Sequence, residues 1–181
     1  SGIQNHELLY TGCLRTPIYA HLNSINLHNN TYSIIPENFS TMADVYVVLN
    51  KIIPKNIYSK SPDGKAYTKL NSLSRIARSF GFDYTKSSES LIRHLASNIF
   101  KNQMKTISKI INLNIKKYFH LRSPFSIIGL GIGHNHIKDI CKSEAHNYSS
   151  TNKMLAKYIK NSDQLLEIYP AFVLSQFNDE I

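Results

Sequence analysis

The first part of the chain mixes short apolar runs with polar residues and turn-forming residues, which favours strands over long helices. Residues 8–10, 18–22 and 31–35 are the predicted strands, because each is a short apolar run bounded by turn residues. Asn29 and Asn30 stand between the last two runs, and asparagine tolerates the backbone angles of a tight turn. The pattern therefore predicts a hairpin between residues 18–22 and 31–35.

Helical periodicity replaces this pattern in the middle of the chain. Helices are predicted over residues 42–53, 70–80, 88–118 and 135–141, with a final one over 165–177. For the first of these helices, Ser40 or Thr41 is the expected N-cap, with Asp44 in the first turn and Pro54 as the end. Gly81 is expected to cap the second.

Two glycine-containing segments mark turns between these elements. Pro62, Asp63 and Gly64 form a typical tight turn, since proline presets φ and glycine accepts a positive φ. Residues 125–128 form a compact apolar strand that runs into the glycines at 129, 131 and 133. Residues 143–160 are polar, with one short strand or helix expected near Met154. Strands first, then mostly helices with one late strand, predict an α/β or α+β domain.

Composition limits the class of protein without defining its function. The chain has 181 residues, of which 42% are hydrophobic, which suits one packed domain. Its formal charge of +9 favours phosphorylated small molecules, nucleic acid or an acidic surface as partners. An AT-rich genome, which enriches lysine and asparagine, would explain the same charge without any partner. The two cysteines are expected to be reduced, and the chain shows neither a secretory signal nor a membrane-spanning apolar run.

The glycine run is a candidate nucleotide site. Gly129, Gly131 and Gly133 lie between a predicted strand and a predicted helix, where backbone N–H groups and a helix N-terminus can hold an anion. The run lacks the third spaced glycine of a dinucleotide fingerprint and the Gly-Lys-Ser of a P-loop. A tight strand-to-helix turn without a ligand is the alternative.

Two short segments carry candidate anion-binding and acidic groups. Arg15 and Thr16 join a five-donor guanidinium to a hydroxyl beside a proline, a combination that can hold a phosphate or carboxylate. A surface arginine before a strand is the alternative. Thr41 and Asp44 place a hydroxyl and a carboxylate at one helix start, where ordinary N-capping is the alternative.

The remaining polar groups are less specific. Asp63 and Lys65 place a carboxylate and an amine on one loop, with a solvated turn as the alternative. His134 and His136 lack a third ligand, so no metal site is predicted from them. The sequence shows no basic motif interleaved with aromatic residues, so direct nucleic-acid binding is not favoured.

Each of these motifs is a weak indication of function by itself, but their order along the chain is more informative. The motifs are Glu-Leu-Leu-Tyr-Thr-Gly at 7–12, Leu-Arg-Thr-Pro at 14–17, Phe-Ser-Thr-Met-Ala-Asp-Val-Tyr at 39–46, Asp-Gly-Lys at 63–65, Arg-Ile-Ala-Arg at 75–78, the glycine run, and Tyr-Pro-Ala at 169–171. In this order they resemble the hydantoinase/oxoprolinase-like proteins linked to tetrahydromethanopterin C1 transfer. That family includes the methanofuran-biosynthesis synthases.

The resemblance implies a fold of the actin-like ATPase superfamily, built from RNase-H-like α/β domains. The chain resembles the C-terminal portion of the family, without the two phosphate loops that precede it there. We therefore expect one incomplete RNase-H-like domain over residues 1–181, with a mostly helical insertion over 37–122. We also expect that activity needs an N-terminal half or a partner chain.

The resemblance also implies an activity, a transferase reaction. It condenses a phosphorylated furan with an aminoethylphenol-type amine and releases diphosphate. The implied substrate or phosphate-binding residues are Arg15, Thr16, Thr41, Asp44, Asp63 and Lys65, and the implied nucleotide-binding residues are Gly129, Gly131 and Gly133. ATP and Mg²⁺ are the candidate cofactors, and a cytoplasmic location is expected. An ATP-dependent hydrolase or small-molecule kinase is one alternative, and a non-catalytic remnant that serves as an interaction domain is another.

Overall fold

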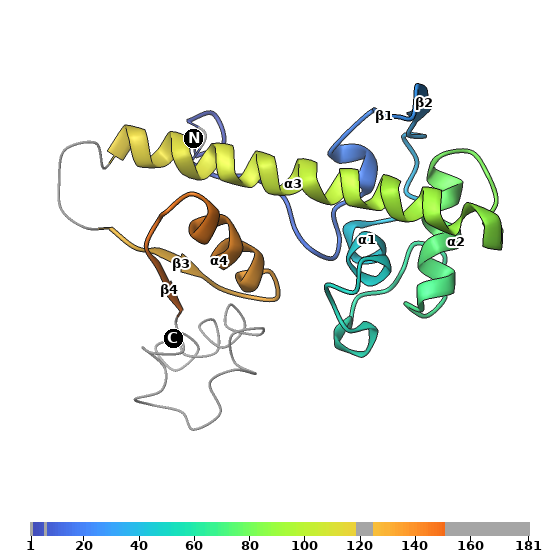
Figure 1. The fold of residues 1–181 in the computed structure, drawn as a ribbon. Coiled ribbons are helices and arrows are strands. Elements are labelled where there is room, and N and C mark those ends of the chain that lie inside the picture. Colours follow the sequence, from blue (N-terminus) through green and yellow to red (C-terminus); the bar gives the residue numbers. More distant parts are fainter. Residues whose placement is uncertain (1, 6, 119–124, 151–181) are drawn as a thin grey trace. The chain divides into compact units, whose positions relative to one another are not determined.

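The chain is divided into two compact units. The computed structural model describes residues 2–5, 7–118 and 125–150. Unit 1 comprises Ser1–Lys109 and unit 2 comprises Ile110–Ile181. The long helix α3 (Glu89–Tyr118) begins in unit 1 and ends in unit 2, as its continuous ribbon in Figure 1 shows. Helices with two small sheets make up the described residues, which confirms the α/β class.

A β-hairpin lies near the start of unit 1. Strand β1 (Ser24–Leu27) pairs antiparallel with β2 (Asn30–Ser33). The two residues between them, His28 and Asn29, have φ values of 49° and 64°, the left-handed region that a two-residue hairpin loop requires. The predicted hairpin is therefore confirmed, although its first strand lies at β1 rather than at residues 18–22.

Two predicted strands before this hairpin are wrong. Leu8 and Tyr10 are 50% and 80% exposed, and within the described part of the chain residues 8–10 have no partner strand. Without a neighbouring strand an apolar tripeptide gains nothing from an extended ladder. Residues 18–22 instead open with a 3₁₀ turn, η1 (Ile18–Ala20), which buries Ile18. Pro17 just before it forms a single bridge with Thr41.

Helix α1 (Met42–Val48) is buried along its whole length. The sequence predicted that it would continue to residue 53. It ends earlier because Asn50 adopts a left-handed φ of 55°, a conformation in which a helix cannot continue. Pro54 therefore does not end this helix but opens the 3₁₀ turn η2 (Pro54–Asn56).

Helix α2 (Lys69–Ser79) packs against α1 and follows the prediction closely. The hydroxyl of Thr68 accepts the N–H of Asn71 at 3.1 Å, which caps its start. Gly81 has a φ of 79°, so it provides the expected left-handed residue after the helix. A further 3₁₀ turn, η3 (Lys86–Ser88), leads into α3.

The first half of α3 completes the core of unit 1. Its buried positions recur at helical spacing: Ile92, Leu95, Ala96, Ile99 and Gln103. Arg93 donates from Nη1 to the carbonyl of Val48 at 2.9 Å, which satisfies an acceptor at the end of α1. The rings of Tyr46 and Phe100 meet edge to face, with centroids 5.5 Å apart. The predicted helix over residues 88–118 is thus confirmed.

Unit 2 contains a βαβ unit. Strand β3 (Ile127–Gly129) pairs in parallel with β4 (Tyr148–Ser150), and α4 (His134–Ser143) connects them (Figure 1). Asn112, near the end of α3, donates to Glu144 Oε2 at 3.1 Å and pairs with His146 Nε2 at 2.9 Å. The strand and helix predicted at 125–128 and 135–141 are confirmed with small shifts. The predictions at residue 154 and at 165–177 lie outside the described residues.

Candidate functional site

A buried arginine joins two carboxylates from different segments of unit 1. Arg75 lies in the middle of α2 and is 0% exposed. Its Nε and Nη2 donate to Asp44 Oδ1 at 2.9 and 2.7 Å, and its Nη1 donates to Asp63 Oδ1 at 2.8 Å. Ser72 lies within 3.4 Å of Nη2. The guanidinium therefore holds α1, α2 and the loop between them together.

The electrostatics of this network follow from burial. Asp44 is 0% exposed, and burial raises its pKa, although hydrogen bonds and charge from Arg75 oppose that shift. Burial acts to lower the pKa of Arg75, but the two carboxylates outweigh it and raise that pKa. The guanidinium therefore remains charged at neutral pH. Because each buried charge has a hydrogen-bonded partner, the arrangement avoids the large penalty of an unpaired ion.

Asp44 also organises the start of its own helix. Its Oδ2 accepts the N–H of Thr41 at 3.0 Å, so the carboxylate closes the first turn of α1 while its other oxygen binds Arg75. In this structure its oxygens are used within the fold and are not exposed to a substrate. The contacts therefore support the capping alternative for the Asp44 carboxylate, whereas the buried Thr41 Oγ1 has no hydrogen-bond partner among the described residues.

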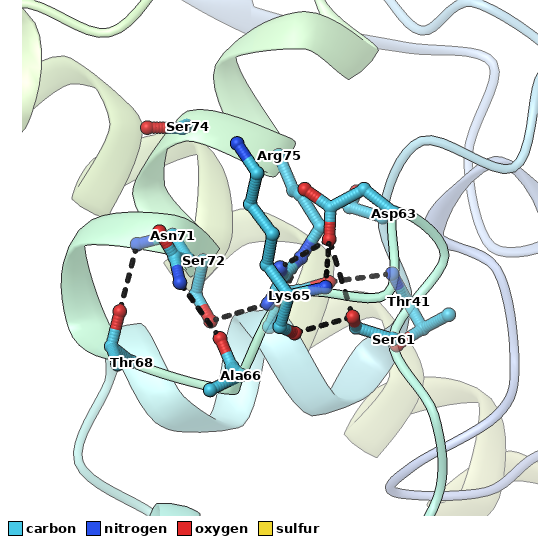
Figure 2. Close-up of polar contacts among 12 residues, drawn as sticks. Thr41, Ser61, Asp63, Lys65, Ala66, Thr68, Asn71, Ser72, Ser74 and Arg75 are labelled. Carbon is cyan, nitrogen blue, oxygen red and sulfur yellow. Dashed lines mark hydrogen bonds and ion pairs between the residues drawn. The ribbon is translucent and has the colours of Figure 1, made fainter.

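The loop before α2 is fixed by its own hydrogen bonds, as Figure 2 shows. Asp63 Oδ1 accepts the N–H of Lys65 at 3.1 Å, and Ser61 Oγ donates to the Lys65 carbonyl at 2.5 Å. Gly64 has a φ of 74°, which confirms the predicted tight turn. Hydrogen bonds from the Lys65 N–H and from Arg75 lower the pKa of Asp63, although its partial burial opposes them. The side chain of Lys65 extends away from these bonds (Figure 2).

The Arg-Thr-Pro segment lies beside the start of α1. The carbonyl of Thr16 accepts the N–H of Met42 at 2.8 Å, and the carbonyl of Leu14 accepts that of Ala43 at 3.3 Å. Thr16 Oγ1 also accepts the N–H of Gly12 at 2.9 Å. Arg15, between them, is exposed. The main chain of this segment therefore satisfies N–H groups that the first turn of α1 leaves open.

A second buried polar side chain joins the same segments to α3. Gln103 is 1% exposed, accepts the Tyr46 hydroxyl at 2.8 Å, and donates to Thr11 Oγ1 at 2.8 Å. The motifs at 7–12 and 39–46 are thus joined in space by one amide.

The structure brings most of the predicted site residues together. Thr16, Thr41, Asp44 and Asp63 belong to one connected set of contacts, Lys65 joins it through its main chain, and Arg15 lies exposed on an adjoining segment. Sequence reasoning did not assign a role to Arg75 or Gln103. Ser72, Arg75 and Ser79 are buried on α2, but a polar helix face is ordinarily exposed to solvent, so the local sequence carried no signal for these contacts.

The local geometry of unit 2 explains why glycines occupy the run at 129–133. A β-carbon on Gly129 would lie 2.6 Å from Tyr148 Oη, and Gly131 has a φ of 74°. Gly133 is the N-cap of α4 and contributes no side-chain cap. These glycines permit close approach of β3 to Tyr148 and a tight turn into α4, which supports the alternative of a strand-to-helix turn. The nucleotide-binding assignment stays a prediction.

Other reactive groups do not define a site within the described residues. Cys13 and Cys141 are free thiols, and burial raises the pKa of each. The described residues contain no group of three histidine, cysteine or acidic side chains arranged for a metal. Of the helices in the described ranges, none has the length and apolarity needed to cross a bilayer.

Comparison with known proteins defines the class. Residues 2–153 match the hydantoinase/oxoprolinase family, so the chain belongs to that family. It is 31% identical over 161 residues to a relative from Methanococcus vannielii, which covers 86% of this chain and 70% of the relative. That relative is named (4-{4-[2-(gamma-L-glutamylamino)ethyl]phenoxymethyl}furan-2-yl)methanamine synthase.

A second relative carries the same name. It comes from Methanocaldococcus jannaschii and is 24% identical over 137 residues, which is 76% of this chain but 40% of the relative. These names confirm that the predicted resemblance to methanofuran-biosynthesis synthases was correct. The match covers 40% of this second relative, so the activity and partners of the whole protein are proposed separately for this chain.

Proposed function

We propose that this chain is part of a synthase that joins a phosphorylated furan to an aminoethylphenol-type amine in the biosynthesis of a methanofuran-type cofactor. The similarity to the Methanococcus vannielii synthase over 86% of the chain carries this proposal. The name of that synthase describes a product with a phenoxymethyl-furan group. In the proposed reaction the phenol oxygen loses its proton and bonds to the furan CH₂ carbon. The bond from that carbon to diphosphate breaks, and diphosphate leaves.

Cationic side chains near the Arg75 network suit such a leaving group. Arg15 and Lys65 are exposed, and both lie on segments that the network fixes in place. Positive charge aimed at a departing diphosphate stabilises the transition state. Thr16 and Asp63 lie on the same segments, but Thr16 Oγ1 and Asp63 Oδ1 already accept hydrogen bonds from within the fold. Buried Asp44 and Thr41 have a positioning role in this proposal, since they set the position of Arg75 and α1.

Mg²⁺ and ATP are the candidate cofactors of the proposed reaction. Mg²⁺ commonly accompanies diphosphate, but the described carboxylates at Asp44 and Asp63 share the Arg75 guanidinium, which a metal would have to displace. The described residues therefore do not favour a protein-bound Mg²⁺ at this position. ATP is proposed as a ligand of the glycine turn in unit 2, where β3 leads into the N-terminus of α4.

The proposed fold of the whole protein is the RNase-H-like, actin-like ATPase fold. The parallel βαβ unit with a glycine turn supports it, because such a turn can form the adenosine side of a nucleotide site. We propose that the phosphate loops of the complete site are carried by an N-terminal half or a partner chain. A cytoplasmic location goes with small phosphorylated substrates and is part of the same proposal.

A second candidate function is ATP-dependent ring opening or phosphorylation by a hydantoinase/oxoprolinase-like enzyme. The family match and the glycine turn favour it. ATP hydrolysis that depends on a cyclic amide would support this second function, whereas condensation without nucleotide would support the first.

The deciding experiment uses the protein encoded by its complete gene. It is incubated with a furan-methanamine diphosphate and a glutamyl-aminoethylphenol, and the aryl ether and free diphosphate are measured by mass spectrometry and a phosphate assay. The Methanococcus vannielii relative serves as the positive control. Product with matching diphosphate release is expected. No product, under conditions in which the control is active, would reject the synthase function.

A further inference from the structure

Unit 1 contains a hollow that the network around Arg75 does not fill. Its volume is about 360 Å³, and its lining comes entirely from the segment between residues 54 and 67. Small-molecule sites typically occupy about 300–1,000 Å³, so the hollow suits a small ligand better than a dinucleotide.

The charged lining of this hollow is wholly positive. Lys55, Lys60 and Lys65 line it, and no acidic residue does. Within the described part of the chain none of these three amines forms an ion pair with a carboxylate. Asp63, the acidic residue of this segment, is instead held by Arg75. The hollow therefore presents three uncommitted cations, which favours an anion with more than one charge.

A buried hydroxyl adds a neutral donor. Ser59 is one of the lining residues, and its Oγ is shielded from solvent and has no hydrogen-bond partner among the described residues. A buried hydroxyl without a partner costs free energy, which a ligand oxygen would recover if the side chain turned its hydroxyl toward the hollow. The neighbouring Ser61 is already used, because it donates to the Lys65 carbonyl.

The backbone around the hollow is held in place before any ligand arrives. Asp63 accepts the Lys65 N–H and binds Arg75, and the N–H of Gly64 donates to the Ser61 carbonyl at 3.1 Å. A fixed loop loses little conformational entropy on binding, so its charges are more effective.

One side of the hollow is apolar. Ile57 and Tyr67 line it, and both belong to a cluster with Ala43 and Val47 of α1. Tyr67 is 9% exposed, so its ring forms part of the floor and not a mobile cover. A flat ring can pack on this side while an attached phosphate reaches the lysines.

We propose that this hollow binds the phosphate end of a small ring-bearing phosphate ester, with Lys55, Lys60 and Lys65 holding the phosphate oxygens and Ile57 and Tyr67 contacting the ring. The proposal rests on the proposed function, for which it names the site of the phosphorylated ring. It adds Lys55, Lys60 and Ser59 to the residues that would bind substrate.

The test measures binding of inorganic diphosphate to the complete protein by calorimetry. The variants Lys55→Gln, Lys60→Gln and Lys65→Gln each remove one charge at an exposed position, so the fold is expected to remain intact. Each should weaken binding about tenfold, because one charge-assisted hydrogen bond is lost. Ser59→Ala should weaken binding about threefold to tenfold for the neutral donor.

Matched controls lie on α3. Lys101→Gln and Lys105→Gln, at positions that line a different hollow, change the net charge equally and should leave affinity within about twofold. If these controls weaken binding as much as the three lysine variants, the attraction is general and the proposal is rejected. Absence of diphosphate binding by the unaltered protein also rejects it.

The apolar side is tested with two further probes. Phenyl phosphate should bind about fivefold to tenfold more tightly than methyl phosphate, since the ring buries additional apolar area. Equal affinities would reject ring contact. Binding is measured without synthesis, so the two proposals fail separately. Diphosphate binding without ether formation would reject the synthase function, whereas ether formation at an unchanged KM in the lysine variants would reject this site.

Discussion

Arg75 Nη2 lies 2.7 Å from Asp44 Oδ1, and the two side chains are 1% and 0% exposed. They come from two adjacent helices and meet where water cannot replace either partner. The stability of unit 1 therefore depends on both charges being present, because a buried charge without its partner is strongly unfavourable.

Replacing Arg75 should be severely destabilising. Arg75→Met leaves Asp44 buried without a counter-ion and should lower the free energy of unfolding by about 3–5 kcal/mol. Urea denaturation followed by circular dichroism measures this change. Arg78→Met on the same helix is the matched control, since the Arg78 side chain is 46% exposed and its pair with Asp63 is 3.9 Å long. It should cost less than about 1 kcal/mol. Similar losses of unfolding free energy in both variants would show that the buried Arg75–Asp44 pair contributes no more than the exposed Arg78–Asp63 pair.

Asp63 should make the protein sensitive to acid. Its pKa in the folded state lies below the ordinary value of 3.8 because the Lys65 N–H and Arg75 favour the charged form. At low pH this carboxyl therefore binds more protons in the unfolded state than in the folded state. The stabilisation that ionised Asp63 gives to the folded state is present above about pH 4 and is lost as pH falls through the folded-state pKa.

The difference between the unaltered protein and Asp63→Asn isolates this effect, since the raised pKa of Asp44 acts in the opposite direction. We expect the two stability curves to converge as pH falls below 4. NMR titration of the Asp63 carboxyl should give a pKa below 3.8, and a value above it would contradict the prediction.

Gln103 should be necessary for the stability of unit 1, because its amide oxygen and its amide nitrogen both form hydrogen bonds. Gln103→Leu leaves the Tyr46 hydroxyl and Thr11 Oγ1 without this partner and should cost about 2–4 kcal/mol. Lys101→Leu, at an exposed position of the same helix, should change stability by less than about 0.5 kcal/mol. A double-mutant cycle with Tyr46→Phe should be non-additive, since each change removes the same hydrogen bond. Additive losses would mean that this bond contributes little.

Gly129 should not tolerate a side chain. A β-carbon there would lie 2.6 Å from Tyr148 Oη and 2.8 Å from its ring, so Gly129→Ala should cost about 1–3 kcal/mol. Thermal unfolding measures this loss. Gly12→Ala is the matched control and should be tolerated, since its new β-carbon would lie 3.7 Å from Thr16 Oγ1, an ordinary van der Waals contact. Combining Gly129→Ala with Tyr148→Leu should restore part of the loss, and failure to do so would point to another source of strain.

Most helices of the described residues were predictable from local signals. The apolar spacing of α3 and the cap at Gly81 are encoded within a few residues, and both are present in the structure. The strands predicted at 8–10 and 18–22 were wrong, because a short apolar run becomes a strand only if another strand lies beside it. The end of α1 depended on the left-handed conformation of Asn50, which asparagine tolerates but does not require.

The candidate site was predictable in part. Motif order selected Thr41, Asp44 and Asp63, which the structure places around one guanidinium. The motif block at 75–78 contained Arg75, but its role arises from a contact across 31 residues of sequence, which no local pattern specifies. The hollow with Lys55 and Lys60 likewise depends on how the loop folds back on α1.

The continuity of α3 has a consequence for protein engineering. The boundary between the two units falls at Lys109 and Ile110, inside a helix of 30 residues and not in a linker. A fragment cut at that boundary would end in the middle of a helix, with four carbonyl groups newly exposed at its end. Expression of unit 1 by itself should therefore retain α3 to Tyr118, and domain exchange between relatives should place its junctions outside this helix.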